Sequence, residues 1–279
     1  MLNLDYEIKV KKITDWVSIW FFGDQHFGSS ACAVGDMRDT ISQINADPNA
    51  YVVYMGDFCD FINFTDKRFD PKHVAKEFLP HLDDLPRRMA DSFVDMTDSL
   101  TPKTICGIPG NHDEKIRLRY HFDAAAYICG RLRVPLLSVV SQLRIRVTDG
   151  KHHSYMVKGV LSHAEKGSVT VGGKLAASER MADYYGDHDF FAQAHTHEYL
   201  IFDGRNLDVA GDFKPGESPR TVERTRLTFL TGGYLKTYAP GSAGYGERRG
   251  YRPCRLGSPR LEMRMRRGND IDERELRGI

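Results

Sequence analysis

Short apolar runs that each end in a polar loop recur along this chain of 279 residues. Three of them, at 17–22, 51–55 and 104–108, are rich in β-favouring residues and have about the length of a buried strand. Glycine comes soon after each run and stops the extension. The pattern predicts three buried strands that lead into polar loops at Gly23, Gly56 and Gly110.

Helical periodicity separates these predicted strands. Met37, Ile41 and Ile44 recur at helical spacing, and Asp47–Pro48 ends that pattern. A longer helical pattern covers 71–100 with a break near 80–86, and others cover 115–132 and 174–185. The first two strands and the helix between them form a predicted β-α-β unit.

The second half of the chain changes to the two-residue period of half-buried strands. Leu143, Ile145 and Val147 alternate with polar residues, and the Asp149–Gly150 turn leads to a second run at 155–161. Further strands are predicted at 189–193, 199–202, 227–230 and 261–265, and loops at 211–220 and 239–259. The chain is therefore predicted to be α/β, with either one mixed sheet or two sheets packed together between helices.

The composition is that of a globular protein, with 41% hydrophobic and 28% charged residues. The 39 basic and 38 acidic residues nearly cancel, so the overall charge indicates no particular partner. The five cysteines include no Cys-x-x-Cys pair, which is typical of reduced thiols rather than disulfides or a zinc finger. The N-terminus does not resemble a secretion signal, and no apolar run reaches the roughly 20 residues that cross a bilayer. We expect a cytoplasmic protein with no membrane partner.

Near the C-terminus the charge is locally basic. Between Tyr245 and Arg267 there are eight arginines against Glu247 and Glu262. With Tyr245 and Tyr251 interleaved, this stretch could bind a polyanion such as nucleic acid, or it could be a solvated tail. We expect one domain over 1–279, with a core at about 17–233 and a basic extension at 234–279. The sequence carries no signal for an oligomeric state.

Side chains able to bind a metal follow five of the predicted strands. Oxygen donors suit hard divalent ions, and imidazole suits manganese, iron, nickel or zinc. Because ligands bind outside the carboxyl ends of strands in open α/β sheets, these loops can converge. A mixed set of aspartate, asparagine and histidine is what a pair of ions would need. The residues are Asp24 with His26, Asp57 with Asp60, Asn111 with His112, His163, and His195 with His197.

Each of these residues alone also has a purely structural interpretation. Asp24 could cap a helix or lie in a turn, and Asp60 could cap a helix. His26 could be a surface histidine, and Asn111 could be a turn residue. The residues occur as an ordered set, and each group follows an apolar run. This conjunction favours a metal site over these alternatives.

The ordered set resembles the calcineurin-like metallophosphoesterases. The matching motifs are Asp-x-His, Gly-Asp-x-x-Asp, Gly-Asn-His-Asp, a lone histidine and His-x-His, and they lie within residues 17–233. The resemblance implies a four-layer αββα sandwich, in which helices flank two mixed sheets and a two-metal site lies at the strand ends. It also implies a phosphoesterase whose metal-bridging hydroxide attacks phosphorus.

Carried over residue by residue, the resemblance implies two sets of ligands and a bridge. Asp24, His26 and His197 would hold the first ion, and Asn111, His163 and His195 the second, with Asp57 between them. His112 would face the substrate and assist the leaving oxygen, and Asp60 would orient His112. The implied cofactors are two divalent ions, Mn²⁺ first, with Fe, Zn, Ni or Mg as alternatives.

Departures from the family pattern indicate the substrate class. Phe61–Ile62 stands where the Ser/Thr protein phosphatases have arginine and glycine, so the bidentate clamp for a phosphate dianion is missing. The motif at Gly110–Glu114 is also closer to the Gly-Asn-His-Asp of the family's nucleases and phosphodiesterases than to the Gly-Asn-His-Glu of its protein phosphatases. We therefore expect a phosphodiesterase acting on a nucleotide or nucleic acid; the alternatives are a phosphomonoesterase and a non-catalytic scaffold. Lys115, Arg117 and Arg119 are interpreted as solvated charge.

Overall fold

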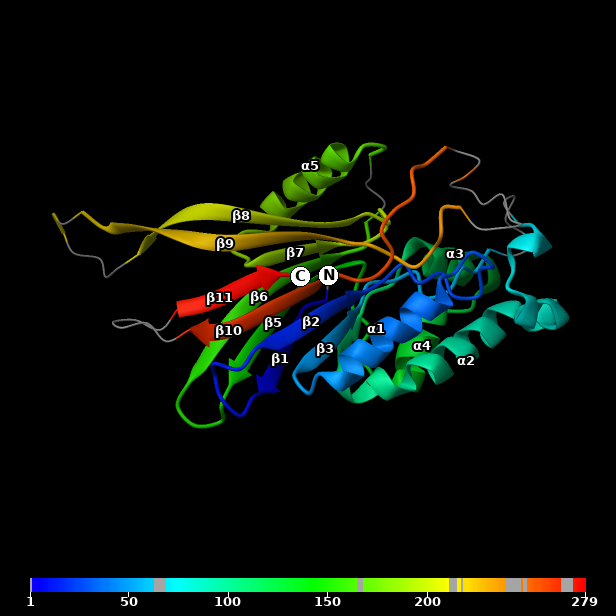
Figure 1. Cartoon of the computed structure of the whole chain (residues 1–279), viewed down its shortest axis with the longest axis horizontal. Helices are drawn as coiled ribbons and strands as arrows, with labels where there is room; N and C mark the ends of the chain where they lie inside the picture. The colour runs from blue at the N-terminus through cyan, green and yellow to red at the C-terminus, as the bar shows by residue number, and fades with distance from the viewer. Residues whose placement is uncertain are drawn as a thin grey trace.

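The computed structural model describes residues 2–62, 69–164, 168–210, 215–216, 218–238, 247, 250–266 and 273–279. These residues form two β-sheets with helices on both outer sides (Figure 1). The strands are β1 (Leu4–Lys9), β2 (Val17–Phe22), β3 (Ala50–Tyr54), β4 (Thr104–Gly107), β5 (Val140–Thr148), β6 (Ser154–Ser162), β7 (Phe190–Gln193), β8 (Tyr199–Ala210), β9 (Arg220–Thr231), β10 (Arg260–Arg266) and β11 (Glu273–Gly278). The α-helices are α1 (Val34–Ala46), α2 (Leu85–Thr97), α3 (Asn111–Tyr120), α4 (Ala124–Leu132) and α5 (Val171–Ala182).

Both sheets contain parallel and antiparallel pairs. The five-stranded sheet has the order β11-β10-β2-β3-β4, with β2, β3 and β4 parallel and β10 antiparallel to its neighbours. The six-stranded sheet has the order β1-β5-β6-β7-β9-β8, in which β6, β7 and β9 are parallel. Parallel neighbours end at the same edge of a sheet, which brings the loops after β2, β3 and β4 together.

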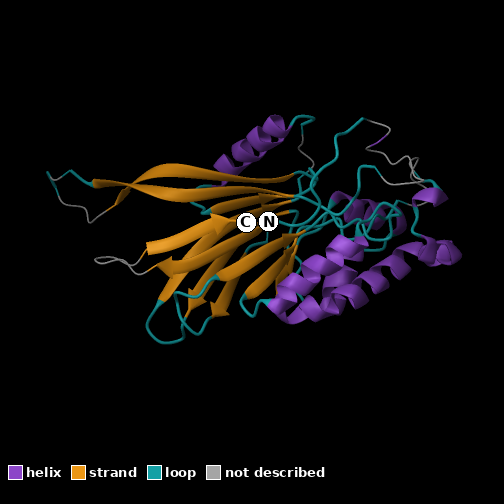
Figure 2. Ribbon diagram, in the orientation of Figure 1, coloured by secondary structure: helices purple, strands orange, loops and turns teal. Residues whose placement is uncertain are grey.

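Three apolar cores separate four layers. One core lies between the five-stranded sheet and helices α1, α2 and α4, and a second fills the space between the two sheets. A third, smaller core lies between α5 and the six-stranded sheet. Figure 2 shows α5 on one side of the strands and the other helices on the opposite side. The predicted αββα sandwich of two mixed sheets is confirmed.

Strand β2 is buried on both faces, which explains its continuous apolar sequence. Ile19 and Phe21 face the core between the sheets, whereas Trp20 and Phe22 face the helices. The ring of Phe21 lies 5.6 Å from that of Phe190 and 4.9 Å from that of Phe229. Burying a phenylalanine of this kind contributes about 1.5–3 kcal/mol, and a strand covered on both faces has no place for the polar residues of an alternating pattern.

Three strands lie outside the expected core of 17–233. β1 pairs with β5 at the edge of one sheet, and β10 pairs with both β2 and β11 in the other. The strand predicted at 261–265 is thus a member of the five-stranded sheet, and the interpretation of the arginine-rich stretch as a solvated tail is wrong for 260–266. Residues 239–246, 248–249 and 267–272 of the basic extension lie outside the described part.

The helical regions are more divided than their periodicity predicts. The region 115–132 forms two helices, because His121 has a left-handed backbone with φ of 55° and the side chain of Asp123 caps α4 by accepting the N–H of Ala126 at 2.9 Å. The region 71–100 contains 3-10 turns at Pro71–His73, Lys76–Asp84 and Asp98–Lys103 around α2. No helix in the described ranges is long and apolar enough to cross a membrane.

Gly159 provides a test of the packing between the sheets. A Cβ at this position of β6 would overlap the ring of Phe190. We expect Gly159→Ala to lower the free energy of unfolding by about 1–3 kcal/mol, measured by urea denaturation, because overpacking a core forces side chains from their preferred rotamers. The matched control is Gly130→Ala in α4, where a Cβ meets nothing within 4 Å and should stabilise by about 0.5–1 kcal/mol. Equal stability of the two variants would contradict the packing described.

Candidate metal centre

The structure brings the nine predicted site residues together at one end of the strands. Asp24 and His26 follow β2, Asp57 and Asp60 follow β3, and Asn111 and His112 begin α3 after β4. His163 follows β6, and His195 and His197 follow β7. Both sheets therefore contribute to the site, as expected if parallel strands end at a common edge. Their ligand atoms form the clusters Asp24–His26–His197 and Asp57–His163–His195, and Asp60 and His112 join His26.

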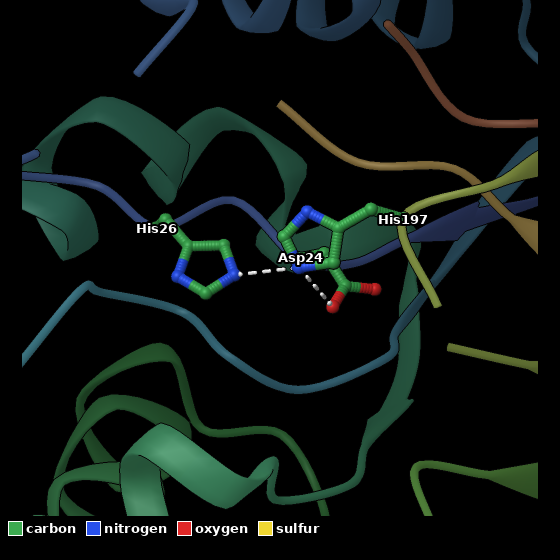
Figure 3. Close-up of side chains that lie close together, drawn as sticks. All are labelled: Asp24, His26 and His197. Carbon is green, nitrogen blue, oxygen red and sulfur yellow. Dashed lines mark hydrogen bonds and ion pairs between the residues drawn. The ribbon is translucent and has the colours of Figure 1, made fainter. Parts of the chain in front are cut away.

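The first cluster contains Asp24, His26 and His197 (Figure 3). Nε2 of His197 lies 3.1 Å from Nε2 of His26 and 3.4 Å from Oδ1 of Asp24. Asp24 and His26 are almost fully buried, whereas His197 is partly exposed and forms the open side. A carboxylate and two imidazoles that converge in this way offer one oxygen and two nitrogen donors to a divalent ion.

The second cluster contains Asn111, His163 and His195 next to Asp57. The carbonyl oxygen of Asn111 lies 2.8 Å from Nδ1 of His195 and 3.3 Å from Nε2 of His163. Nδ1 of His163 donates to the carbonyl of Met55 at 2.6 Å, which leaves Nε2 of this ring as the acceptor that faces the cluster. A backbone carbonyl that fixes the tautomer of a ligand histidine is a common feature of metal sites.

Asp57 lies between the two clusters. Its Oδ2 is 3.7 Å from Nε2 of His26 in the first and 3.3 Å from Nε2 of His163 in the second. Oδ1 accepts the N–H of His112 at 2.8 Å, so the start of α3 holds the carboxylate in place. This position fits a carboxylate shared by two ions.

His112 and Asp60 contact each other, but through the backbone carbonyl of Asp60 rather than through its carboxylate. Nδ1 of His112 lies 2.5 Å from the backbone carbonyl oxygen of Asp60 and 3.6 Å from its carboxylate. The same carboxylate is nearer, at 3.3 Å, to Nδ1 of His26. The carbonyl of Asp60 therefore orients His112, and its carboxylate forms a carboxylate–histidine pair with His26.

The backbone at the site is held in an uncommon conformation. Of the eight non-glycine residues with positive φ in the described ranges, five are Asp24, His26, Asp57, His195 and His197. Their φ values lie between 45° and 72°, the left-handed region that carries a cost for most side chains. Clustering of such residues at one place indicates that the loops are shaped for function at the expense of local backbone energy.

Glycine allows the loops after β3 and β4 to approach each other closely. A Cβ on Gly110 would overlap Oδ1 and the backbone nitrogen of Asp57. Asp113 then joins the two loops, because its Oδ2 accepts the N–H of Gly110 at 2.7 Å and of Asp57 at 2.9 Å. The sequence motif contains Asp113, but its structural role depends on this distant contact and could not be predicted.

Burial and charge set the protonation of the centre when no cation is present. Burial, with a contribution from the charge of Asp57, raises the pKa of Asp24 to about 7. Burial alone would lower the pKa of His163, but Asp57 and Asp24 raise it to about 10. Burial opposes ionisation of Asp57 too, yet the surrounding histidines, His163 foremost, hold the pKa of this carboxyl well below its usual range.

The donor set fits cations. With its oxygen directed inward, the Asn111 amide places this oxygen 2.8 Å from Nδ1 of His195 and 3.2 Å from Oδ2 of Asp57, which are both acceptor atoms. The ring nitrogens of His26 and His197 likewise meet at 3.1 Å. Lone pairs that converge on one region repel one another unless a proton or a cation lies between them. The chemistry and convergence of these side chains therefore suit two divalent ions.

Asp24 gives a pH-dependent prediction for the chelator-treated protein. Its folded pKa of about 7 exceeds the ordinary 3.8, so its contribution to stability is present below pH 3.8 and is lost as the pH rises through 7. Asparagine keeps an oxygen for the N–H of His195 and carries no charge. We expect Asp24→Asn to gain on the order of 4 kcal/mol over wild type between pH 4 and pH 8 in urea denaturation.

A matched variant separates this effect from a general loss of negative charge. Asp39→Asn removes an exposed carboxylate on α1 and should follow the wild-type pH profile. Parallel profiles for wild type and Asp24→Asn would show that ionisation of Asp24 does not oppose folding.

Sequence reasoning missed a charged group directly beside the His-x-His pair. Glu198 is buried, and Lys174 of α5 contacts it at 3.2 Å and Arg252 at 3.1 Å. Nζ of Lys174 also donates to the carbonyl of Thr196 at 3.0 Å. These contacts attach α5 and the segment around Arg252 to the loop that carries His195 and His197.

Two arginines of strand β10, in the basic extension, have carboxylate partners. Arg260 contacts Glu262 at 2.9 Å and Arg264 contacts Glu275 at 2.7 Å. Arg264 and Arg277 also stack on Trp16, at 4.2 Å and 4.0 Å from the ring centre. Binding of a polyanion by the whole stretch stays a prediction, because Arg248, Arg249 and Arg267 lie outside the described residues.

Several solved structures resemble the chain at low sequence identity. Vps29 of Entamoeba histolytica, a single mutant, has a TM-score of 0.40 and 12% identity over 94% of this chain and 99% of its own. Vacuolar Protein Sorting 29 of Cryptosporidium parvum has a TM-score of 0.34 and 13% identity over 95% and 98%. A predicted phosphoesterase of Streptococcus pneumoniae has a TM-score of 0.33 and 12% identity over 94% and 99%. No family model and no curated protein matches the chain. At these identities and TM-scores the likeness assigns no activity.

Proposed function

We propose that the protein is a calcineurin-like metallophosphoesterase that hydrolyses a phosphodiester of a nucleotide or nucleic acid. The observation that carries the proposal is the pair of clusters on either side of Asp57, each with imidazole and oxygen donors directed inward. Two divalent ions held there, Mn²⁺ first among the candidates, would act as Lewis acids on the phosphoester and supply a hydroxide nucleophile at neutral pH.

The protein's own residues have separate tasks in this proposal. Asp24, His26 and His197 would hold one ion and Asn111, His163 and His195 the other, and Asp57 would be shared between them. His112, whose Nδ1 is held by the carbonyl of Asp60, keeps Nε2 for the leaving oxygen of the substrate. Burial, together with the charge of His26, lowers the pKa of His112 below its usual value, and the negative charges of Asp57 and Asp60 offset only part of this effect.

Phe61 favours a diester over a monoester. It is buried in the core against the helices, with φ of 44°, at the place where the resemblance associates an arginine with phosphate dianions. A diester carries one negative charge and needs no bidentate clamp, whereas a monoester dianion gains most from one.

The test is a substrate panel on protein whose metal content has been measured. We expect about two ions per chain after dialysis against Mn²⁺, and faster hydrolysis of bis-p-nitrophenyl phosphate than of p-nitrophenyl phosphate. Labelled single-stranded DNA and a dinucleotide extend the panel to the proposed substrates. A monoester rate higher by orders of magnitude would favour a phosphomonoesterase, and absence of bound metal would favour a scaffold.

A further inference from the structure

Lys115 lies beside the candidate metal centre and has no role in the proposed chemistry so far. On α3 it is four residues after Asn111 and three after His112, so the three side chains share one face of the helix. Lys115 is partly buried, and its Nζ lies 3.3 Å from the outer atom of the Asn111 amide. Within the described residues no carboxylate lies within 4.0 Å of this ammonium group.

The Asn111 amide has two orientations with different partners. In one, its nitrogen donates to Nδ1 of His195 at 2.8 Å and to Oδ2 of Asp57 at 3.2 Å, and its oxygen accepts from Lys115 at 3.3 Å. All of these groups are then satisfied without a cation. In the other orientation the oxygen faces His195 and Asp57, which is the arrangement that a cation requires because N–H groups repel it.

The orientation that binds a cation leaves two donors facing each other. The amide N–H₂ of Asn111 and the ammonium of Lys115 are then 3.3 Å apart, and neither has an acceptor within the described contacts. Both residues are only partly buried, so a bound substrate can reach the two donors, and an anionic oxygen placed between them satisfies both at once. The site therefore gains an unfilled oxyanion position at the same time as it gains its ion.

We infer that Lys115 and the Asn111 amide together bind one non-bridging phosphoryl oxygen of the substrate. This inference rests on the proposed function, since it requires an ion at the second cluster. Lys115 would supply the positive charge that Phe61 cannot supply. Lysine is a single point charge, unlike the planar fork of arginine, and therefore matches the single charge of a phosphodiester.

The experiment measures binding of inorganic phosphate to manganese-loaded protein by calorimetry. Lys115→Met keeps much of the side-chain volume and removes the charge, and Arg117→Met is the control, an exposed cation on the same helix paired with Glu114. We expect Lys115→Met to raise the Kd for phosphate about 10-fold or more and to raise KM for the diester, with unchanged manganese content. Lys115→Arg should recover part of the binding, and Arg117→Met should match wild type.

The outcomes distinguish this inference from the proposed function. If wild type holds two ions and binds phosphate but Lys115→Met binds it equally well, the inference is wrong and the proposed function stands. Loss of manganese from a folded Lys115→Met protein would also overturn it, because Lys115 would then support the ions rather than the phosphate. If wild type holds no ions, both fail, and thermal unfolding of each variant shows whether it is folded.

Discussion

Replacing Asp57 by asparagine is expected to lower hydrolysis by about 10³-fold or more and to reduce the bound metal below two ions per chain. The carboxylate of Asp57 lies between the two clusters, at 3.7 Å from His26 and 3.3 Å from His163. Ions in such a site contribute several kcal/mol of transition-state stabilisation, and each 1.36 kcal/mol corresponds to about tenfold in rate. An amide has no charge to share between two cations.

The substitution is chosen to preserve the local structure. Asparagine keeps an oxygen for the N–H of His112, and asparagine tolerates the left-handed φ of 52° at this position better than most residues. Asp187→Asn, which removes an exposed carboxylate paired with Lys158, is the control and should retain full activity and metal. A folded Asp57→Asn protein with two ions and wild-type activity would exclude a bridging role for this carboxylate.

The strands that carry the site could be predicted because each is a local pattern. The runs at 17–22, 51–55 and 104–108 correspond to β2, β3 and β4 within one residue at each end. These strands are covered on both faces, so each appears in the sequence as a continuous apolar run. The candidate ligands follow these runs directly, and their convergence needs only the rule that parallel strands end at one edge.

Other elements depend on partners that are distant in the sequence. β11 contains Glu273, Arg274, Glu275 and Arg277, a composition that does not indicate a strand, and it pairs with β10 through the whole register. β1 shows an alternating pattern, but the strand with which it pairs, β5, begins at Val140. Edge strands of this kind are stabilised by a neighbour, which the local pattern does not reveal.

The same limit applies within the site. The residue types identify candidate ligands, but the contacts of Asp60 and Lys115 depend on atomic positions. The carboxylate of Asp60 is nearer to His26 than to His112, and the ammonium of Lys115 lies beside the amide of Asn111. Lys115 alternates with Arg117 and Arg119, which predicts solvated charge, but it also lies four residues after Asn111, a spacing that places both side chains on one face of α3.

His112→Asn is expected to lower kcat for a dinucleotide by about 10²–10⁴-fold while both ions stay bound, because it removes the group proposed to protonate the leaving oxygen. The loss should depend on the leaving group. A nucleoside alkoxide needs a proton as it departs, whereas p-nitrophenolate is a stable anion. Hydrolysis of bis-p-nitrophenyl phosphate should therefore fall much less than hydrolysis of the dinucleotide, in assays that vary only the substrate.

Asp60→Asn is the variant to compare with His112→Asn on the same two substrates. Nδ1 of His112 contacts the backbone carbonyl of Asp60, which asparagine retains, whereas the lost charge lies nearer to His26. We expect Asp60→Asn to reduce metal affinity and to show a loss that is similar for both leaving groups. If His112→Asn also lost activity equally on both substrates, His112 would be a residue that positions the substrate or ions rather than a general acid. If the loss depends on the leaving group in His112→Asn but not in Asp60→Asn, the ring of His112 donates the proton to the leaving oxygen. The backbone carbonyl of Asp60, rather than its carboxylate, then orients that ring.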